Sequence, residues 1–67
     1  MLKALKDING KEIKAGDSVV VPVPEAGDPW SHTHTATVVG TRGGILFTVV
    51  DQDDNHWDIE AYRLEII

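Results

Sequence analysis

Apolar residues recur at every second position in several short segments, a period that is typical of β-strands rather than helices. The pattern predicts strands over residues 18–23, 33–41, 45–50, 56–59 and 64–67. In the first strand Val19, Val21 and Val23 share one face, which is predicted to be buried. Ile45 begins the same alternation in the third strand. Residues 60–63 are predicted to form a single helical turn.

Turn signals separate the predicted strands. The sequence RGG at residues 42–44 supplies the positive φ angles that a tight hairpin requires. Residues 51–55, with the sequence DQDDN, are predicted to form a polar turn whose side chains bond to their own backbone. The resulting order is strand, long loop, three-strand meander, helical turn and last strand. This is the order of elements in an SH3-like barrel.

Residues 1–14 allow two interpretations. The Asn9-Gly10 pair is a strong hairpin signal, which favours extended chain with a turn at that point. The spacing of Leu2, Leu5 and Ile8 also suits one or two turns of helix. We predict one domain over residues 1–67, in which 1–14 form an extension or hairpin and 15–67 form the barrel core.

A domain of this size needs an economical fold. A chain of 67 residues buries only about 60% of the surface that its unfolded form exposes. Curling a sheet into a barrel protects strand edges, and Gly40 on the inward face of 33–41 suits a tight bend. We therefore predict an all-β fold, a small SH3-like barrel of about five antiparallel strands with one short helical turn near the C-terminus.

The composition narrows the classes of protein. There are no cysteines, which excludes disulfides, thiolate metal sites and cysteine nucleophiles and fits a reducing compartment. The N-terminal sequence MLKALKDING lacks the apolar run of a secretory signal, and no segment approaches the ~20 apolar residues of a membrane span. We expect a cytoplasmic monomer without membrane contact.

Acidic residues outnumber basic ones by eleven to six, which gives a net charge of −5. Four of the six cations fall within residues 1–14, and only Arg42 and Arg63 follow. Nucleic-acid-binding proteins usually carry a basic stripe, because neutralised phosphates supply most of their affinity. The acidic body of this chain makes a nucleic-acid partner less expected than a protein partner.

Four segments, GDSVVVPV, ATVVGTRGG, FTVVDQDDNHWDI and YRLEII, together resemble the pattern of small SH3-like barrels of the KOW and Tudor type. The resemblance covers roughly residues 15–67 and implies a binding domain. KOW-type barrels often contact RNA through basic loops, and Arg42 is the matching cation here. Tudor-type barrels often hold a methylated cation in an aromatic cage. The aromatic residues of this chain are Trp30, Phe47, Trp57 and Tyr62.

The segment DPWSHTHT, residues 28–35, raises the possibility of a metal site. On an extended strand His32 and His34 point the same way, about 6.5 Å apart, so both can reach one ion. A zinc site needs at least one more ligand, for which His56, Asp28 and Asp58 are the candidates. The alternative is two partly exposed histidines in a loop. We expect no cofactor.

The aromatic residues raise a second choice. Trp30 lies in the longest loop, where a large ring either packs down as a lid on the core or contacts a ligand. Trp57 is in register with Ile59 and, like Phe47, is predicted to face inward. Tyr62 lies on the helical turn, where its ring can pack while its hydroxyl group stays in water.

Catalytic signals are weak. Ser31 and His32 are neighbours that are predicted to point in opposite directions, and the acidic residues of 51–58 do not fit the EF-hand template. We therefore predict a non-catalytic module that binds a protein or peptide through the loop 24–35, the hairpin 42–44 and the turn 53–57. The predicted contact residues are Trp30 as anchor, His32, His34, Arg42, Trp57 and Tyr62. RNA binding and histidine-based metal binding are the alternatives.

Overall fold

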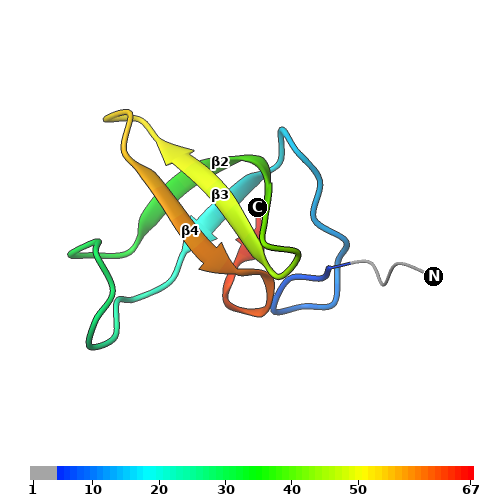
Figure 1. Cartoon of the computed structure of the whole chain (residues 1–67), viewed down its shortest axis with the longest axis horizontal. Coiled ribbons are helices and arrows are strands. Elements are labelled where there is room, and N and C mark those ends of the chain that lie inside the picture. Colours follow the sequence, from blue (N-terminus) through cyan, green and yellow to red (C-terminus); the bar gives the residue numbers. More distant parts are fainter. Residues whose placement is uncertain (1–4) are drawn as a thin grey trace.

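The computed structural model describes residues 5–67. This part of the chain forms five strands and one short 3-10 turn (Figure 1). In chain order these are β1 (Ser18–Val21), β2 (His34–Arg42), β3 (Leu46–Asp51), β4 (His56–Glu60), the turn η1 (Ala61–Arg63) and β5 (Glu65–Ile66). The predicted all-β fold of five strands with one helical turn is confirmed.

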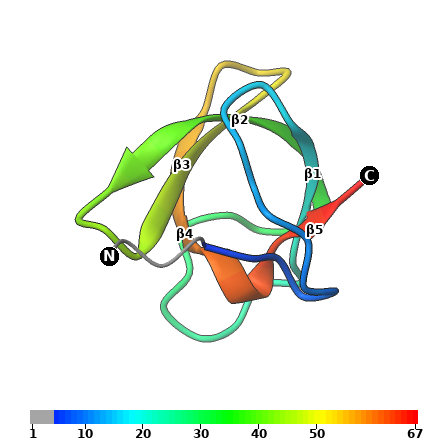
Figure 2. The ribbon, with the colours of Figure 1, turned by 90° about the vertical axis from the view of Figure 1, so that its right-hand side faces the viewer.

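The strands form one antiparallel sheet in the order β4-β3-β2-β1-β5. The sheet curls strongly around the core, as the end-on view of Figure 2 shows. In residues 5–67, β4 and β5 are the two edges and do not pair, so the barrel stays open between them. A register shift between Val38 and Gly40 interrupts the β2–β3 pairing. Gly40 is the residue at which the sequence predicted a tight bend of the sheet.

The core collects the inward-facing side chains of all the longer strands. Trp57 packs against it at the edge. The predicted alternation is correct through β2, where Ala36 and Val38 are buried between exposed neighbours. The buried apolar residues are Ile13, Val19, Val21, Trp30, Ala36, Val38, Phe47, Val49, Ile59, Ala61 and Leu64.

Two residues that were predicted to face inward are exposed. Val23 is 71% exposed because β1 ends at Val21, before Pro22, which has no amide proton to continue the pairing. Ile45 is 65% exposed because Arg42 pairs with Leu46, which leaves residues 43–45 as the hairpin turn. The two glycines of this turn have positive φ angles, as predicted.

The N-terminal turn is organised by a buried carboxylate. Asp7 accepts hydrogen bonds from the amides of Asn9 and Lys11 through Oδ1 and from the amide of Ile66 in β5 through Oδ2. The Ile66 amide is the main reason why the pKa of Asp7 lies below its usual value; partial desolvation opposes it and the other amides reinforce it. The turn therefore ties the start of the chain to its last strand.

Residues 5–14 are extended around this turn, as favoured over a helix. Lys6 forms a bridge with Glu12, and Gly10 has a φ of 80°. Leu2, part of the alternative helical spacing, lies outside the described residues. Within residues 5–67, no helix is long and apolar enough to cross a membrane.

Candidate functional site

A cleft of about 220 Å³ lies between the end of the long loop and the β3–β4 turn. Antiparallel pairing creates it, because the start of β2 lies beside the end of β3. In Figure 1 the loop and the turn both lie on the left-hand side of the molecule. The cleft is lined by Pro29, Trp30, Ser31, His32, His34, Asp51, Gln52, Asp53, Asn55 and Trp57.

Trp30 lines the cleft on one side and covers the core on the other, as a lid. Its side chain leaves only 4% of the residue exposed, and its Nε1 donates a hydrogen bond of 2.9 Å to the carbonyl of Pro22. Its ring meets that of Trp57 edge to face, with centroids 6.1 Å apart. Of the two interpretations that the sequence allowed, the structure has the lid. An exposed Trp30 anchor does not fit this position, because the core of so small a domain uses the ring.

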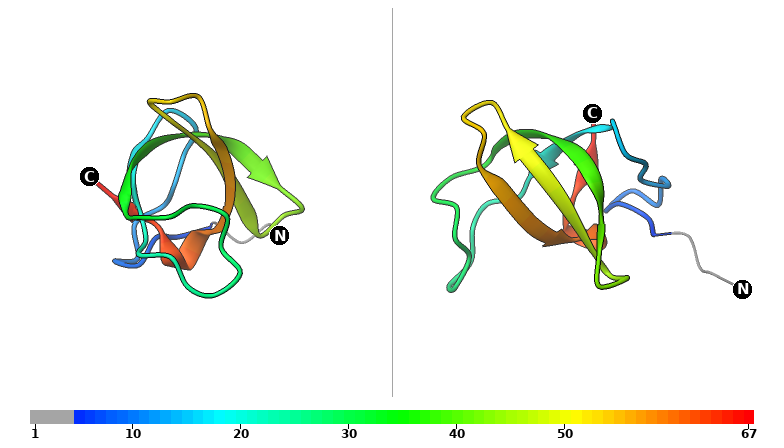
Figure 3. Two further views of the ribbon diagram at one scale, coloured as in Figure 1. Left: turned by 90° about the vertical axis from the view of Figure 1, so that its left-hand side faces the viewer. Right: turned by 45° about the horizontal axis from the view of Figure 1, so that its top comes forward.

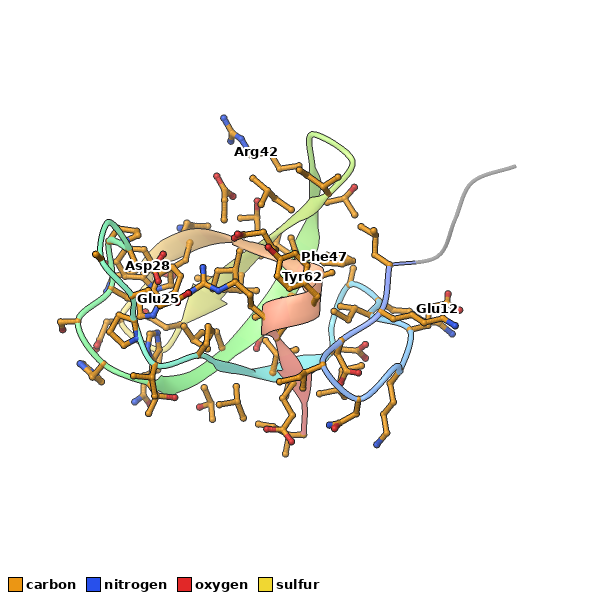
Figure 4. The ribbon with its side chains drawn as sticks, turned by 90° about the horizontal axis from the view of Figure 1, so that it is seen from below. Glu12, Glu25, Asp28, Arg42, Phe47 and Tyr62 are labelled. Carbon is orange, nitrogen blue, oxygen red and sulfur yellow. The ribbon has the colours of Figure 1, made fainter. Side chains whose placement is uncertain are left out.

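A partly buried ion pair holds the loop over Trp30. The guanidinium of Arg63, on η1, is 2.6 Å from Oδ2 of Asp28 and also contacts Oδ1 at 3.3 Å. It lies 5.4 Å from the ring centre of Trp30 and 3.4 Å from Glu60. Arg63 holds the pKa of Asp28 below its usual value, and Asp28 raises the pKa of Arg63. Figure 4 shows Asp28 and Glu25 on this loop. The ion pair therefore holds in place the loop that forms one wall of the cleft.

Asp51, at the end of β3, is the centre of the opposite wall. Its Oδ1 accepts hydrogen bonds from the amides of Asp53 (2.9 Å) and Asn55 (3.0 Å). Its Oδ2 accepts a hydrogen bond of 3.2 Å from Nε1 of Trp57 and one of 3.4 Å from the side-chain amide of Asn55. Burial acts to raise the pKa of Asp51, but these hydrogen bonds outweigh it and hold the pKa below its usual value. The cleft thus contains an ionised, largely buried carboxylate.

His34 faces this carboxylate from the start of β2. Its Nε2 is 3.3 Å from Oδ2 of Asp51, close enough for an ion pair but not aligned for a hydrogen bond, so Nε2 is buried without a hydrogen-bond partner. Its Nδ1 is 2.9 Å from the carbonyl oxygen of His32. The ring of His32 is exposed, with its centre 5.4 Å from that of His34.

The metal hypothesis finds no third ligand in the part of the chain that the structure describes. No three histidine or acidic side chains of residues 5–67 are gathered so that they could hold an ion. Asp28 is paired with Arg63, and Asp58 with Thr48 and Arg42. His56 is exposed at the start of β4, opposite Val50.

Arg42 and Tyr62 do not belong to the cleft. Successive turns of an antiparallel meander lie at opposite ends, so the hairpin 43–45 is separated from the β3–β4 turn by the length of β3 (Figure 3). The nine residues of β2 span roughly 26 Å between His34 and Arg42. Arg42 is 3.5 Å from Asp58 instead. The predicted surface that joined the hairpin to the loop is therefore wrong.

The position of Tyr62 also differs from the prediction that its ring packs. The residue is 68% exposed on η1, so its ring is not packed, and its hydroxyl is 3.5 Å from Glu60. The structure brings together four of the six predicted contact residues, which are Trp30, His32, His34 and Trp57.

Ser31 and His32 also differ from the prediction. Because they lie in a bend and not in a strand, Oγ of Ser31 is 3.1 Å from Nδ1 of His32. Both residues are exposed, and within residues 5–67 no carboxylate is hydrogen-bonded to His32. The pair therefore lacks the third group that orients the base in a serine nucleophile system.

The sequence predicted that side chains of the turn 51–55 bond to their own backbone, and Asp51 does so by accepting hydrogen bonds from the amides of Asp53 and Asn55. It did not predict Asp51 as a residue of the site. The same spacing appears at Asp7, Asn9 and Lys11. The contact of Asp51 with His34 has no local sequence signal, because it depends on the pairing of β2 with β3.

Comparison with known proteins adds no relative to this picture. No protein-family model, curated protein or solved structure is significantly similar to the chain.

Proposed function

We propose that this domain is a small non-catalytic binding module that takes a cationic side chain of a protein or peptide partner into the cleft. The observation that carries the proposal is the ionised carboxylate of Asp51 beside the half-buried ring of Trp57. A guanidinium or ammonium group interacts favourably with both a carboxylate and an indole ring. The resemblance to Tudor-type barrels gives the same expectation of a cationic ligand.

The size of the cleft supports a single side chain as its ligand. Sites for small molecules and cofactors usually measure about 300–1,000 Å³, and this cleft measures about 220 Å³. A lysine or arginine side chain is long and narrow, so its charged end can enter while the rest of the partner stays outside. The partner's backbone would then lie over the exposed rim at His32 and Asp53.

The charge of the domain supports a cationic partner over nucleic acid. Asp53 is exposed on the rim, and the whole chain carries a net charge of −5. Phosphate groups would be repelled at this surface. Arg42, the cation that suggested RNA binding, lies at the far hairpin and contacts Asp58.

A pair of neighbouring aspartates tests the proposal. Asp53 lines the cleft, whereas Asp54 follows it in the turn and does not. We expect acetyl-Gly-Arg-Gly-amide to bind the wild type, and the matching peptide with neutral citrulline not to bind. D53N should lower the affinity for the arginine peptide about threefold or more, as for loss of one exposed charge pair, and D54N should change it little.

The measurement is a titration by calorimetry or NMR at low ionic strength. Both variants change the net charge equally, so a general effect of charge would weaken binding in both. Equal affinities for the arginine and citrulline peptides would contradict the proposal. Salt-sensitive binding of a single-stranded RNA in place of the arginine peptide would favour the nucleic-acid alternative.

A further inference from the structure

The hydrogen-bonding positions of His34 do not suit a neutral imidazole ring. The carbonyl oxygen of His32 is only an acceptor, so the 2.9 Å contact places a proton on Nδ1. In a neutral ring Nε2 would then carry a lone pair only 3.3 Å from Oδ2 of Asp51, with no proton between the two atoms. The imidazolium form has protons on both nitrogens and suits both neighbours.

The surroundings of His34 make Asp51 its principal charged neighbour. From β3, Asp51 faces it, and from the loop the ring of His32 lies beside it. On β1 its paired residue is the apolar Val21. Asp53 lines the same cleft from the turn, and from β4 the indole of Trp57 donates to the same oxygen of Asp51.

More hydrogen-bond donors surround the carboxylate of Asp51 than it can accept with good geometry. Oδ1 already accepts two backbone hydrogen bonds, and Oδ2 has three nitrogen atoms at 3.2–3.4 Å, from Trp57, His34 and Asn55. His34 is the one of these that is not aligned for a hydrogen bond. A donor that entered from the cleft would therefore replace His34 most easily.

We infer that His34 is a resident counter-ion of Asp51 that competes with the partner's cation, so that the cleft binds cations more tightly when His34 is neutral. The inference rests on the proposed function, because it concerns the same cleft. When His34 carries a proton, it neutralises Asp51 and repels a second cation. When the proton is lost, the lone pair on Nε2 and the carboxylate form two acceptors for an ammonium or guanidinium group.

Linkage makes the effect reciprocal. If loss of a proton from His34 strengthens cation binding, cation binding must promote loss of that proton by the same factor. Binding at a pH where the ring is partly protonated should therefore release protons to the buffer. Asp51 stays ionised in this range because its pKa lies below the usual value, so it does not contribute to the release.

The test measures the affinity of acetyl-Gly-Arg-Gly-amide for the whole chain at about pH 5.5 and about pH 8, on either side of the range where histidine usually titrates. In the wild type the affinity should rise about fivefold or more with pH, the lower end of typical coupling between sites. In H34Q the rise should fall below about twofold. H56Q changes an exposed histidine that does not line the cleft and should keep the wild-type dependence.

Calorimetry in two buffers of different ionisation enthalpy supplies a second readout, since proton release changes the apparent heat. Wild type and H56Q should release protons on binding at a pH between these two values, and H34Q should not. Equal affinity at both pH values in the wild type would overturn the inference while leaving the proposed function intact. Retention of the pH dependence by folded H34Q would overturn it as well. Absence of binding at about pH 8 in the wild type would overturn both.

Discussion

Two turns of this domain are organised by an aspartate in the same way, and they differ in what the second carboxylate oxygen contacts. Asp7 and Asp51 each use Oδ1 to accept hydrogen bonds from the amides two and four residues further on. At Asp7, Oδ2 accepts the backbone amide of Ile66 and so joins two distant parts of the chain. At Asp51, Oδ2 meets only side chains, those of Trp57, Asn55 and His34.

This difference separates a structural turn from a candidate binding turn. A backbone amide in a sheet cannot move away without disrupting the pairing of β5, so the contacts of Asp7 are fixed. Side chains can rotate, and the side chains around Asp51 border a cleft. The same local arrangement therefore joins one turn to β5 and leaves the other turn with a carboxylate that lines a cleft.

The largest expected effect is the loss of stability on replacing Trp30, the lid on the core. W30A should lower the free energy of unfolding by about 3–5 kcal/mol, because it removes a buried ring from the core and the partner of Trp57. Y62A removes a ring that is 68% exposed and should change the free energy of unfolding by less than about 0.5 kcal/mol. Urea unfolding of both variants measures this difference, and similar losses in the two would place Trp30 outside the core.

The second prediction compares the replacement of each of the two aspartates by asparagine. D7N should lower the melting temperature by roughly 10 °C, because an amide nitrogen or a weaker acceptor would face three backbone donors, one of them in the sheet. D51N should lower it less, since the side chains around Oδ2 can turn away. Binding should show the opposite order, with D51N losing affinity for the arginine peptide and D7N keeping it. A greater loss of stability in D51N than in D7N would contradict the comparison.

The third prediction concerns the stability of the fold at low pH. The pKa values of Asp7, Asp28 and Asp51 are all below the usual value, so each carboxylate stabilises the fold above the unfolded pKa of about 3.9. This stabilisation is lost as the pH falls through the lower pKa of the folded state. Stability should therefore vary little with these groups between about pH 5 and 7 and should fall steeply below about pH 4.

Denaturant unfolding at a series of pH values checks this prediction. D7N has one fewer of these carboxylates, so its stability should fall less between about pH 5 and pH 3 than that of the wild type. A wild-type stability that rises as the pH falls below about 4 would show that the sign is wrong.

The smallest effects are expected for the two asparagines of these turns. Asn9 and Asn55 are both exposed, and their side-chain amides make long hydrogen bonds, of 3.3 Å to Glu65 and 3.4 Å to Asp51. N9A and N55A should each change the free energy of unfolding by less than about 0.5 kcal/mol. N55A, but not N9A, should shift the NMR signal of the Trp57 indole, because only Asn55 shares an acceptor with that indole.

The strands could be predicted from the sequence because their alternation is local. The errors at Val23 and Ile45 arose at strand ends, where Pro22 stops one strand and a three-residue hairpin delays the next. The cleft could be predicted only in part. His32, His34 and Trp57 were found from residue type and spacing. The turn signal at residues 51–55 predicted side-chain bonds to the backbone, but it did not place Asp51 in the cleft.

The remaining contacts depend on residues far apart in the chain. The ion pair of Arg63 with Asp28 joins residues 35 positions apart, and it helps to decide that Trp30 lies inside. The position of Arg42 depends on which end of the meander each turn occupies. Neither relation has a periodic or motif-like signal, so both become visible only in the folded chain.

The most direct test of the central claim follows backbone amides and the Trp57 indole by NMR while acetyl-Gly-Arg-Gly-amide is added at about pH 8. The account predicts shifts at the Trp57 indole and at the amides of Asp53 and Asn55, which surround Asp51, and no comparable shifts at Asn9, Lys11 and Ile66, which surround Asp7. Signals that do not move at the cleft, or that move equally around both aspartates, would contradict it.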